Sequence, residues 1–510
     1  MFGSKRVEQR SVESAVSAEF IERARSGCAE DSARYSKLRL LVVSVVLLCA
    51  TIMPARASTV TVTNTNDSGS GSLRQALAVA NDGDTITVAV TGTIALTSGG
   101  LPVNKSLTIS GPGKDQLSID GNQALLAFGI FPDKTATISG LTIRNGQTGI
   151  WNERGTLTVS NCAVRGNSEA GLFNEGVLTV SNCVVSGNSG GGIFNGYGVL
   201  FVSYCDVSGN SYGIYNYYGE ASVSYCIVSS NHSGGVFDYG VTGGPNDHIF
   251  GIAPLTIADS IINDNSGPGV DNNAGGVTIV DTTISGNSVG KTGGPSDVGG
   301  GVYTYQYGGK TPGNLTVINS TISGNFASSA GGGIACGDSG LTIINSTISG
   351  NSGGAYGGGI ASGSFGMMIV NSTVSGNSAA TCGGVCGGVE IANTILNANA
   401  SGNIDGIVTS HGYNISSDDG GGLLTGPGDQ INTDPLLGPL RDHGGPTLTH
   451  VPLRGSPAID AGDPSFAPPP DHDERGACFY RVFGGRIDVG SVETQPRPRC
   501  VTPAPRPTPH

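Results

Sequence analysis

The sequence predicts an all-β protein that folds as a parallel β-helix, a solenoid in which short strands stack along one axis. Three observations predict it: a repeat of 21 or 22 residues that closes on asparagine, unbroken columns of aliphatic residues within it, and glycine in every copy. The clearest copies read GIWNERGTLTVSNCAVRGN, AGLFNEGVLTVSNCVVSGN, GGIFNGYGVLFVSYCDVSGN and YGIYNYYGEASVSYCIVSSN. A fixed period of this length is typical of stacked repeats rather than of a closed globule.

The closing asparagine recurs over most of the chain, at Asn167, Asn188, Asn210, Asn231, Asn265, Asn287, Asn325, Asn351, Asn377 and Asn399. Side chains in register on successive coils of such a solenoid lie about 4.8 Å apart. We therefore expect these amides to form a structural ladder.

Two aliphatic columns precede each closing asparagine, eight and three residues before it, and Val207 and Ile348 belong to the nearer one. Between them, apolar residues alternate with Ser or Thr, which is the periodicity of strands with one buried face. A repeat of two or three short strands cannot bury that face alone, but stacked copies can. The sequence predicts about a dozen coils, with Val207 and Ile348 inside and Thr158 outside.

The first 57 residues are predicted to direct export. After a polar extension, Lys37 and Arg39 precede the apolar run 40–52 and an A-x-A motif that ends at Ala57. This pattern indicates a secretory signal peptide cleaved after Ala57. The apolar run is shorter than the roughly 20 residues that span a bilayer.

Residues 58–145 are predicted to form an N-terminal cap and the first irregular coils. Ser72 and Gln75 have the spacing of a helix capping box, and Leu73, Ala76 and Leu77 share one helical face. A short helix here would cover the open end of the solenoid, where a terminal coil otherwise exposes its apolar cross-section. The regular repeats occupy 146–405.

A different composition begins after the repeats. Residues 406–497 contain HGYNISSDDGGG, DPLLGPLRDHGGPTLTH and GSPAIDAGD, and we expect a C-terminal cap module there. The tail 498–510 is Pro-rich and is expected to be an extended spacer. Asp463, Asp471 and Asp473 are candidate ligands for calcium, which binds several oxygens. The alternative is that they are solvated turn residues, and no other cofactor is indicated.

Four cysteines share one column of the repeat, five residues before the closing asparagine: Cys162, Cys183, Cys205 and Cys226. Later copies have Ser or Thr there. Buried stacked thiols are the preferred interpretation, because side chains in register point in parallel, which suits a disulfide poorly, and because His and CxxC spacing are missing for a metal site. Disulfides are instead expected for Cys382–Cys386 and Cys478–Cys500.

In the element before each turn of five successive copies, aromatic residues alternate with aliphatic ones. The aliphatic members are Ile150, Leu172, Ile193, Ile214 and Val236, and the aromatic members are Trp151, Phe173, Phe194, Tyr215 and Phe237. If the aliphatic side is inside, the aromatic residues form an outward ladder, which is typical of a binding surface. The alternatives are that loops cover the ladder or that its stacking only stiffens the sheet.

Charge and composition argue against several functions. The formal net charge is −13, and no basic stripe appears that would favour nucleic acid or anionic membranes as partners. No Lys or Arg occurs in 166–290 or 311–440, so the base and the cations that a polyuronate lyase needs are missing there. Body carboxylates are sparse, which disfavours a hydrolase. The enzyme alternative relies on Asp418 and Asp419 or on two TGGP-containing insertions at 242–245 and 292–295.

Several segments resemble known bacterial families. The opening resembles that of large surface β-helix proteins, and GGGIACGDSGLTIINSTISGN and GGGIASGSFGMMIVNSTVSGN resemble polymorphic outer-membrane protein repeats, although Ile348 and Val374 replace the phenylalanine of the second repeat element. The stretches 455–463 and 475–493 resemble a C-terminal module found beside varied surface anchors.

The resemblance implies a single-stranded right-handed parallel β-helix of the pectin-lyase type, exported to the bacterial surface or outer membrane or released from it, with an unidentified anchor. It also implies a monomeric, non-catalytic scaffold that serves adhesion or binds a glycan or a surface protein. The alternative within this fold is a polysaccharide lyase or glycoside hydrolase.

Overall fold

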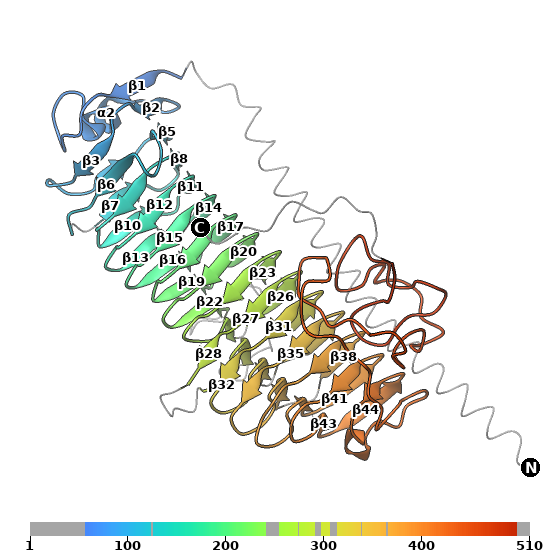
Figure 1. Cartoon of the computed structure of the whole chain (residues 1–510). Coiled ribbons are helices and arrows are strands. Elements are labelled where there is room, and N and C mark those ends of the chain that lie inside the picture. The colour runs from blue at the N-terminus through green and yellow to red at the C-terminus, as the bar shows by residue number, and fades with distance from the viewer. Residues whose placement is uncertain are drawn as a thin grey trace, which may run out of the picture.

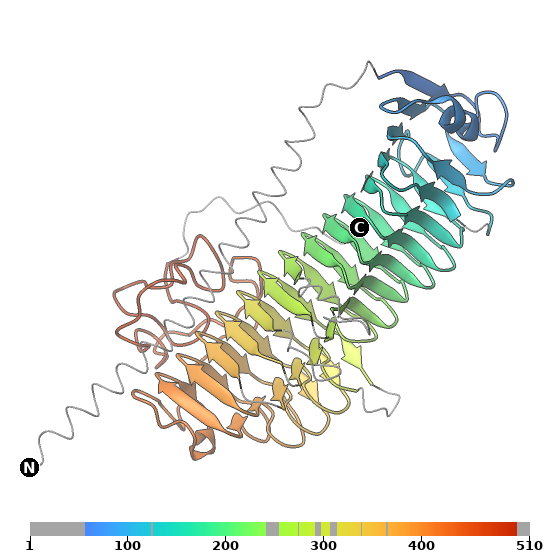
Figure 2. The same cartoon turned by 180° about the vertical axis from the view of Figure 1, so that it is seen from behind.

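The computed structural model describes residues 57–123, 126–240, 254–273, 275–290, 297–305, 314–337, 339–363 and 366–496. The chain forms one long parallel β-helix, with the N-terminal segment at one end and a compact C-terminal module beside the last coils (Figure 1). Seen from behind, the coils stack as a continuous series of strands (Figure 2). Both the predicted class and the predicted direction of strand pairing are confirmed.

A regular coil contributes one strand to each of three sheets, and the pairings between these strands are parallel. The largest sheet has 15 strands within the described residues. Its strands are β1 Thr59–Val62, β2 Thr85–Val88, β5 Leu107–Ser110, β8 Thr135–Ser139, β11 Thr156–Ser160, β14 Val177–Ser181, β17 Val199–Ser203, β20 Glu220–Ser224, β23 Pro254–Ala258, β26 Gly276–Val280, β30 Leu315–Ile318, β34 Leu341–Ile344, β38 Met367–Val370, β41 Val389–Ala392 and β44 Val408–Gly412.

The second sheet has 14 strands in the described chain. Its strands are β3 Gly92–Ala95, β6 Leu117–Asp120, β9 Thr142–Arg144, β12 Ala163–Arg165, β15 Val184–Ser186, β18 Asp206–Ser208, β21 Ile227–Ser229, β24 Ile261–Asn263, β27 Thr283–Ser285, β31 Thr321–Ser323, β35 Thr347–Ser349, β39 Thr373–Ser375, β42 Ile395–Asn397 and β45 Ile415–Ser416.

The third sheet has 13 strands over the same described residues. Its strands are β4 Leu101–Val103, β7 Leu126–Ile130, β10 Thr148–Asn152, β13 Ala170–Asn174, β16 Gly191–Gly196, β19 Tyr212–Tyr217, β22 Gly234–Tyr239, β25 Val270–Asn273, β29 Val302–Tyr305, β33 Ile334–Cys336, β37 Ile360–Ser362, β40 Val385–Cys386 and β43 Ile404–Asp405. A small outer sheet joins β28 Ser288–Val289, β32 Phe326–Ala327 and β36 Ser352–Gly353.

The 15-stranded sheet corresponds to about fifteen coils, which is more than the dozen expected from the sequence. The difference arises at the two ends. Strands β1, β2, β5 and β8 belong to coils that lack the closing asparagine, and β44 follows the last one. The coils of β1, β2, β5 and β8 keep the inward aliphatic pattern but not the amide that identified the others, whereas in β44 Ser410 lies opposite Ile391.

The aliphatic columns form the core. Val207 and Ile348 have no exposed side-chain surface, and Thr158 is half-buried on the outer side, so the predicted inward–outward assignment is confirmed. Register pairs like with like: Val159 of β11 lies opposite Val180 of β14, and Val164 of β12 lies opposite Val185 of β15. Burying each such side chain contributes on the order of 1.5–3 kcal/mol.

The closing asparagines form the predicted ladder inside the core. Asn167 Nδ2 donates to Asn188 Oδ1 at 2.9 Å, and the backbone N–H of Asn167 donates to the same oxygen at 3.1 Å. The series continues to Asn399, whose amide donates to Asn403 Oδ1 at 2.9 Å. A buried amide is tolerated because each rung satisfies the next one.

The cysteine column is buried and its four thiols are free, as expected. The backbone N–H of Cys162 donates to Cys183 Sγ at 3.4 Å and that of Cys205 donates to Cys226 Sγ at 3.5 Å, so these two sulfurs act as hydrogen-bond acceptors at a turn. Hydrogen bonding to Cys183, together with burial, raises the pKa of the Cys162 thiol. The predicted disulfide Cys382–Cys386 is present, and Cys478 is also disulfide-bonded; Cys500 lies outside the described residues.

The N-terminal end is closed by the helix α2 Leu73–Val79. Ser72 is its N-cap and accepts from the backbone N–H of Gln75, and Leu73, Ala76 and Leu77 are buried against the first coils. The predicted cap is confirmed in position and in face. Of the described residues, none form a helix long and apolar enough to cross a membrane.

The C-terminal module has two parts. Up to about residue 436 the chain completes the last coil, with the 3-10 turn η1 Gly420–Gly422 and Leu424 packed on the end of the core. From Leu437 onward it runs back along the outer face of the 14-stranded sheet (Figure 1). Ile395 and Ile415 of the solenoid pack there against Ala458 and Val489 of the module.

Threonines on the outer face of the 14-stranded sheet bind this module. Thr321 Oγ1 donates to Glu474 Oε1 at 3.0 Å, Thr347 donates to the other oxygen of Glu474, and the backbone N–H of Ser491 donates to Thr373 Oγ1 at 3.2 Å. Residues expected to cap the end therefore also cover the flank of the last coils. The export segment that ends at Ala57 lies almost entirely outside the described residues.

Candidate functional site

The outer face of the 13-stranded sheet between β10 and β22 carries the aromatic ladder. Ile150, Leu172, Ile193, Ile214 and Val236 point inward with almost no exposed surface. Because neighbours along a strand point to opposite faces, the aromatic residues beside them point outward. Register places Trp151 opposite Phe173, and Phe173 opposite Phe194. The predicted outward ladder is confirmed; whether it binds a ligand is a separate question.

The rings of the ladder are parallel over four successive coils. Phe173 and Phe194 have centroids 4.8 Å apart with planes at 5°, Phe194 and Tyr215 are 5.0 Å apart at 5°, and Tyr215 and Phe237 are 4.7 Å apart at 10°. Trp151 is turned by 84° against Phe173, and 37% of its surface is exposed. Such offset stacks contribute about 0.5–1.5 kcal/mol per pair. The ladder therefore stabilises the sheet whether or not it binds anything.

A second aromatic row runs beside the ladder, and the sequence reasoning did not find it. Tyr217 and Tyr239, two residues after Tyr215 and Phe237, stack at 5.4 Å. Tyr197 and Tyr218 stack at 5.3 Å in the following turns, and Tyr197 has 67% of its surface exposed. Repetition of tyrosine two and three positions after the ladder residue was the available signal. Together the two rows make a broad aromatic strip over coils 148–240, which we call the aromatic strip.

Four tyrosines occupy turn positions with a left-handed backbone: Tyr197, Tyr204, Tyr218 and Tyr225 have φ between 54° and 61°. At the turn of Tyr204 and Tyr225, other coils have Asn161 and Asn182, and asparagine tolerates this conformation far better than a bulky side chain. Tyr204 nevertheless has 54% of its surface exposed. A strained backbone of this kind persists only where the surroundings maintain it, and here Tyr204 stacks on Tyr225 with ring centroids 4.9 Å apart.

A second amide ladder lies inside the same sheet, beneath the aromatic strip. Asn152 donates to Asn174 Oδ1 at 2.7 Å, and the series continues through Asn195 and Asn216 to Asp238, whose Oδ1 accepts from Asn216 at 2.6 Å. Asp238 is fully buried, and its Oδ2 has no hydrogen-bond partner among the described residues. Burial raises the pKa of Asp238 to about 7.

The aromatic strip is interrupted at β25, where two polar residues take the outward positions. Asp271 lies in register between Phe237 and Tyr303, and Asn273 lies between Tyr239 and Tyr305. One oxygen of each, Asp271 Oδ1 and Asn273 Oδ1, is buried without a hydrogen-bond partner in the described chain. Burial raises the pKa of the Asp271 carboxyl to about 7.

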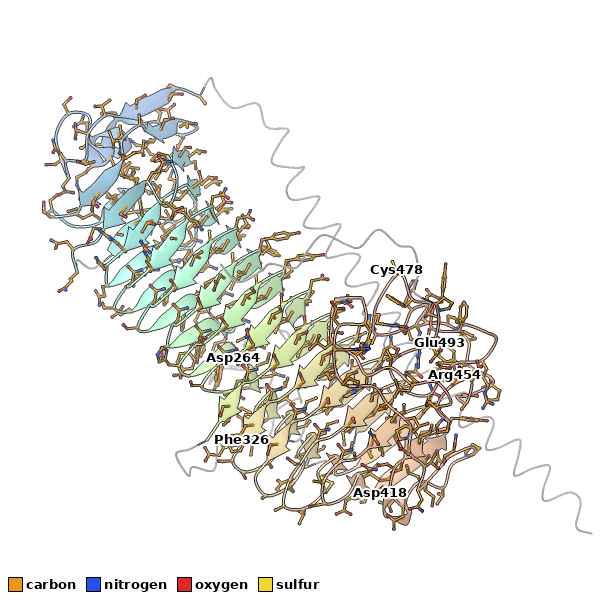
Figure 3. All side chains as sticks on the ribbon, viewed as in Figure 1. Asp264, Phe326, Asp418, Arg454, Cys478 and Glu493 are labelled. Atoms are coloured by element: carbon orange, nitrogen blue, oxygen red, sulfur yellow. A yellow bond between two sulfur atoms is a disulfide. The ribbon has the colours of Figure 1, made fainter. Side chains whose placement is uncertain are left out.

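The residues named for the enzyme alternative have other contacts. Asp418 Oδ1 accepts from Ser416 Oγ and the N–H of Gly420, and Asp419 caps η1 through Gly421. Burial raises the pKa of Asp418, but hydrogen bonds from Ser416, Gly420 and Asn403 outweigh it and hold the pKa below its ordinary value. Asp418 lies at the far end of the solenoid (Figure 3). The two TGGP insertions lie outside the described residues.

The three calcium candidates are not gathered around one point. Asp473 forms an ion pair with Arg475 at 2.6 Å and accepts from the backbone N–H of Glu493 at 2.9 Å, while Asp463 accepts from Ser465. Within the part of the chain that the structure describes, Asp471 forms no hydrogen bond with either of them. Across the described ranges, no group of three or more His, Cys, Asp or Glu side chains is placed to hold a metal ion.

A shallow depression of about 360 Å³ lies on the 14-stranded sheet, lined by Arg144, Asn145, Arg165, Gly166, Ser186 and Gly187. Arg144 and Arg165 are in register on adjacent coils, and Arg144 pairs with Asp120 at 3.2 Å. Arg144 and Arg165 lie on the 14-stranded sheet, whereas the aromatic strip lies on the 13-stranded sheet, so the depression and the strip do not form one site.

Comparison with known proteins agrees with this architecture. A family model described as a right handed beta helix region matches residues 126–322, and the chain is a right-handed parallel β-helix. No curated protein matches the sequence.

Solved structures share the fold at low identity. Pectate lyase Pel9A is 17% identical with a TM-score of 0.35, covering 88% of this chain and 98% of that one. The A-module of mannuronan C-5 epimerase AlgE4 from Azotobacter vinelandii is 15% identical with a TM-score of 0.39, covering 68% and 90%. The catalytic unit of a GH87 α-1,3-glucanase from Streptomyces thermodiastaticus is 17% identical with a TM-score of 0.39, covering 71% and 69%. At this level the likeness concerns the fold and not the activity.

Proposed function

We propose that this chain is a non-catalytic, exported bacterial β-helix scaffold that binds an extended glycan on the aromatic strip. The observation that supports this most is the strip itself: two parallel rows of half-exposed rings across successive coils, bordered by Tyr197 and Trp151. Exposed apolar surfaces of this extent on a soluble protein usually mark an interaction site. A linear polymer matches a surface that is long in one direction and repeats with each coil.

The chemistry of the strip suits a sugar better than a flat apolar partner. Aromatic rings offer apolar surface to the C–H faces of a pyranose, and the hydroxyls of Tyr215, Tyr217 and Tyr239 offer hydrogen bonds at the same place. No Lys or Arg occurs between Arg165 and Lys291, so the strip from Phe173 to Tyr239 has no cation of its own for a polyuronate. Arg154, at the Trp151 end, forms an ion pair with Glu153 at 3.9 Å. A neutral or amino-substituted glycan is the class that fits.

The non-catalytic part of the proposal is supported by the positions and contacts of Asp418 and Asp419, the acids on which the enzyme alternative relies. Asp418 and Asp419 hold turns at the end of the solenoid rather than facing the aromatic strip. A hydrolase needs two carboxyl groups that flank one bond. Asp238 and Asp271 are close in the fold but point to opposite sides of the sheet, because Asp238 belongs to the inward amide ladder.

The export part rests on the signal-like segment and on one contact at its end. The backbone N–H of Ser58 donates to Asp84 Oδ1 at 2.8 Å, and Asp84 is buried. Cleavage after Ala57 would turn that N–H into an α-ammonium group facing a carboxylate. The intact mass of the protein recovered from the culture medium or cell surface should therefore equal that of a chain beginning at Ser58. A mass that includes residues 1–57 would contradict the export part of the proposal.

The binding test uses Trp151, which is the one tryptophan of the chain and lies on the strip. Its fluorescence is titrated with neutral glucan oligomers, chitin and chitosan oligomers, and oligogalacturonates. Binding should shift the emission, and Phe194→Ala or Tyr217→Ala should weaken binding at least tenfold, while Tyr480→Ala in the C-terminal module should not.

Each other outcome of this test decides a separate point. No binding by any oligomer, or equal binding by the strip variants and the wild type, would refute the glycan surface. Release of reducing or unsaturated ends would refute the non-catalytic assignment and favour the lyase or hydrolase alternative. Binding of oligogalacturonate alone would refute the charge argument.

A further inference from the structure

The interruption of the aromatic strip at β25 is the feature that the proposed function does not yet use. On the coils before it, Phe237 stacks on Tyr215 and Tyr239 stacks on Tyr217, so each covers one face of its ring against the preceding coil. The next outward positions hold Asp271 and Asn273 in place of rings. The other faces of Phe237 and Tyr239 are therefore not covered by a further rung of the ladder.

The strip resumes on the far side of the interruption. Tyr303 and Tyr305 follow Asp271 and Asn273 in register, and their rings stack on each other at 4.5 Å. Phe237 and Tyr303 stand two coils apart, which corresponds to about 9.6 Å along the axis, twice the strand spacing. Within the ladder itself one ring occupies each step of the strand spacing, whereas here only the side chains of Asp271 and Asn273 lie in register between the two aromatic pairs.

The floor between these aromatic pairs carries acceptors without donors. Asp271 Oδ1 and Asn273 Oδ1 have no hydrogen-bond partner among the described residues. No Lys, Arg or His of the described chain forms an ion pair with Asp271. Leaving a buried acceptor unpaired costs about 1–3 kcal/mol, and more for a charged group. Burial holds the pKa of Asp271 near 7, as expected for a carboxylate that lacks a compensating charge.

We propose that the polar rung formed by Asp271 and Asn273 is a subsite for a hexosamine unit with a free ammonium group, stacked on Phe237 and Tyr239. An ammonium supplies several N–H donors and a positive charge at once, so it satisfies both oxygens and neutralises the carboxylate. The flanking rings add cation–π attraction. This inference depends on the proposed glycan-binding function and narrows it to glycans that contain unacetylated amino sugar.

The test compares three hexasaccharides of the same linkage and length on the full chain: glucosamine, N-acetylglucosamine and glucose β-1,4 oligomers. Affinity is measured by calorimetry, with Trp151 fluorescence as a second readout. The glucosamine oligomer should bind at least tenfold more tightly than the other two. Asp271→Asn should abolish this preference and leave the affinity for the glucose oligomer unchanged.

Two further variants separate the subsite from general charge attraction, since the chain is acidic overall. Asp264→Asn removes one exposed carboxylate from the same coil, after β24 on the 14-stranded sheet (Figure 3), and should keep the full preference. Asp271→Phe should fill the interruption with a ring and abolish the preference, as Asp271→Asn does.

The outcomes distinguish the subsite from the surface. If the glucose oligomer binds and the glucosamine oligomer binds no better, the subsite is refuted while the proposed function stands. If Asp264→Asn lowers the preference as much as Asp271→Asn does, the preference reflects net charge and the subsite is refuted. If no oligomer binds, the proposed function itself fails.

Discussion

Cys226 and Ser260 occupy the same position on consecutive coils, where the backbone N–H of Cys226 donates to Ser260 Oγ at 3.1 Å. One coil earlier, the backbone N–H of Cys205 donates to Cys226 Sγ at 3.5 Å. The cysteines thus continue a ladder that Ser and Thr form from Ser260 to Thr394. Sulfur serves there as a weak acceptor for a buried N–H group.

This equivalence predicts that Cys226→Ser is tolerated and that Cys226→Val is not. Serine keeps an acceptor for the N–H of Cys205, whereas valine leaves that buried N–H unpaired, at a cost of about 1–3 kcal/mol. Urea unfolding of both variants measures the difference. Equal losses would show that the column matters for its volume and not for its hydrogen bonds.

Asp238→Asn should stabilise the protein above neutral pH. The folded pKa of Asp238, about 7, lies above its ordinary value of 3.8, so its contribution to stability is complete below about pH 4 and is lost as the pH rises through 7. Asparagine would also supply the donor that continues the ladder toward Asn272. We expect a gain on the order of 2 kcal/mol at pH 8 and less at pH 5, by urea unfolding.

The control for this prediction is Asp405→Asn, because Asp405 is an exposed aspartate elsewhere on the 13-stranded sheet. It should leave the pH dependence of unfolding unchanged. A wild-type protein as stable at pH 8 as at pH 5, with Asp238→Asn no better at either pH, would contradict the role assigned to the buried carboxyl.

Docking of the C-terminal module should weaken at alkaline pH. Burial raises the pKa of Glu474 to about 8, above its ordinary 4.5, although Thr347, Ser491 and Thr321 hydrogen-bond to it. Stability from a group of this kind is present at low pH and is lost as the pH rises through 8. Limited proteolysis should cut the module faster at pH 9 than at pH 6, and Glu474→Gln should reduce that difference.

Asp442→Asn is the matched control in the same module, since its side chain is exposed and caps only Gly444. It should be cut like the wild type at both pH values. Should Glu474→Gln lose protection between pH 6 and 9 as steeply as the wild type does, the loosening must come from another group, and Glu493, whose pKa is also raised to about 8, is the next to test.

Val207→Asp should prevent folding of the coils around it, and Thr158→Asp should not. Val207 is fully buried in β18, so an aspartate there would leave an unpaired charge in the core. Thr158 points outward from β11. Circular dichroism and protease resistance of the secreted proteins compare them; similar damage from both would contradict the inward–outward assignment.

The sequence was sufficient to predict the features that repeat at a fixed spacing. Val159 and Asn167 recur with the same chemistry in ten copies, and Cys162 recurs in four before Ser or Thr replaces it, so the burial and the stacking of these columns follow from the period. The outward direction of Phe194 and Tyr215 follows from the inward direction of Ile193 and Ile214 in the same way.

Features that break the period could not be predicted in this manner. Thr321 and Thr347 look like ordinary outward strand residues, and their partner Glu474 lies more than a hundred residues later without any periodic signal. Asp271 was not predicted as a site residue because it interrupts the aromatic column instead of continuing it. In both cases the relevant fact is which side chains meet in space, and a single sequence does not contain it.

The docking of the module on the flank also sets an order of folding. Strand pairs between coils join residues 19 to 38 apart, so each coil can form on the previous one as soon as it is synthesised. The hydrogen bonds of the module to the solenoid join residues 95 to 153 apart and need several finished coils at once. Long-range contacts form late because more chain must first be ordered. A coil that slipped by one position would misplace Thr321, Thr347 or Thr373, so the module closes only over a solenoid whose last coils are correctly aligned.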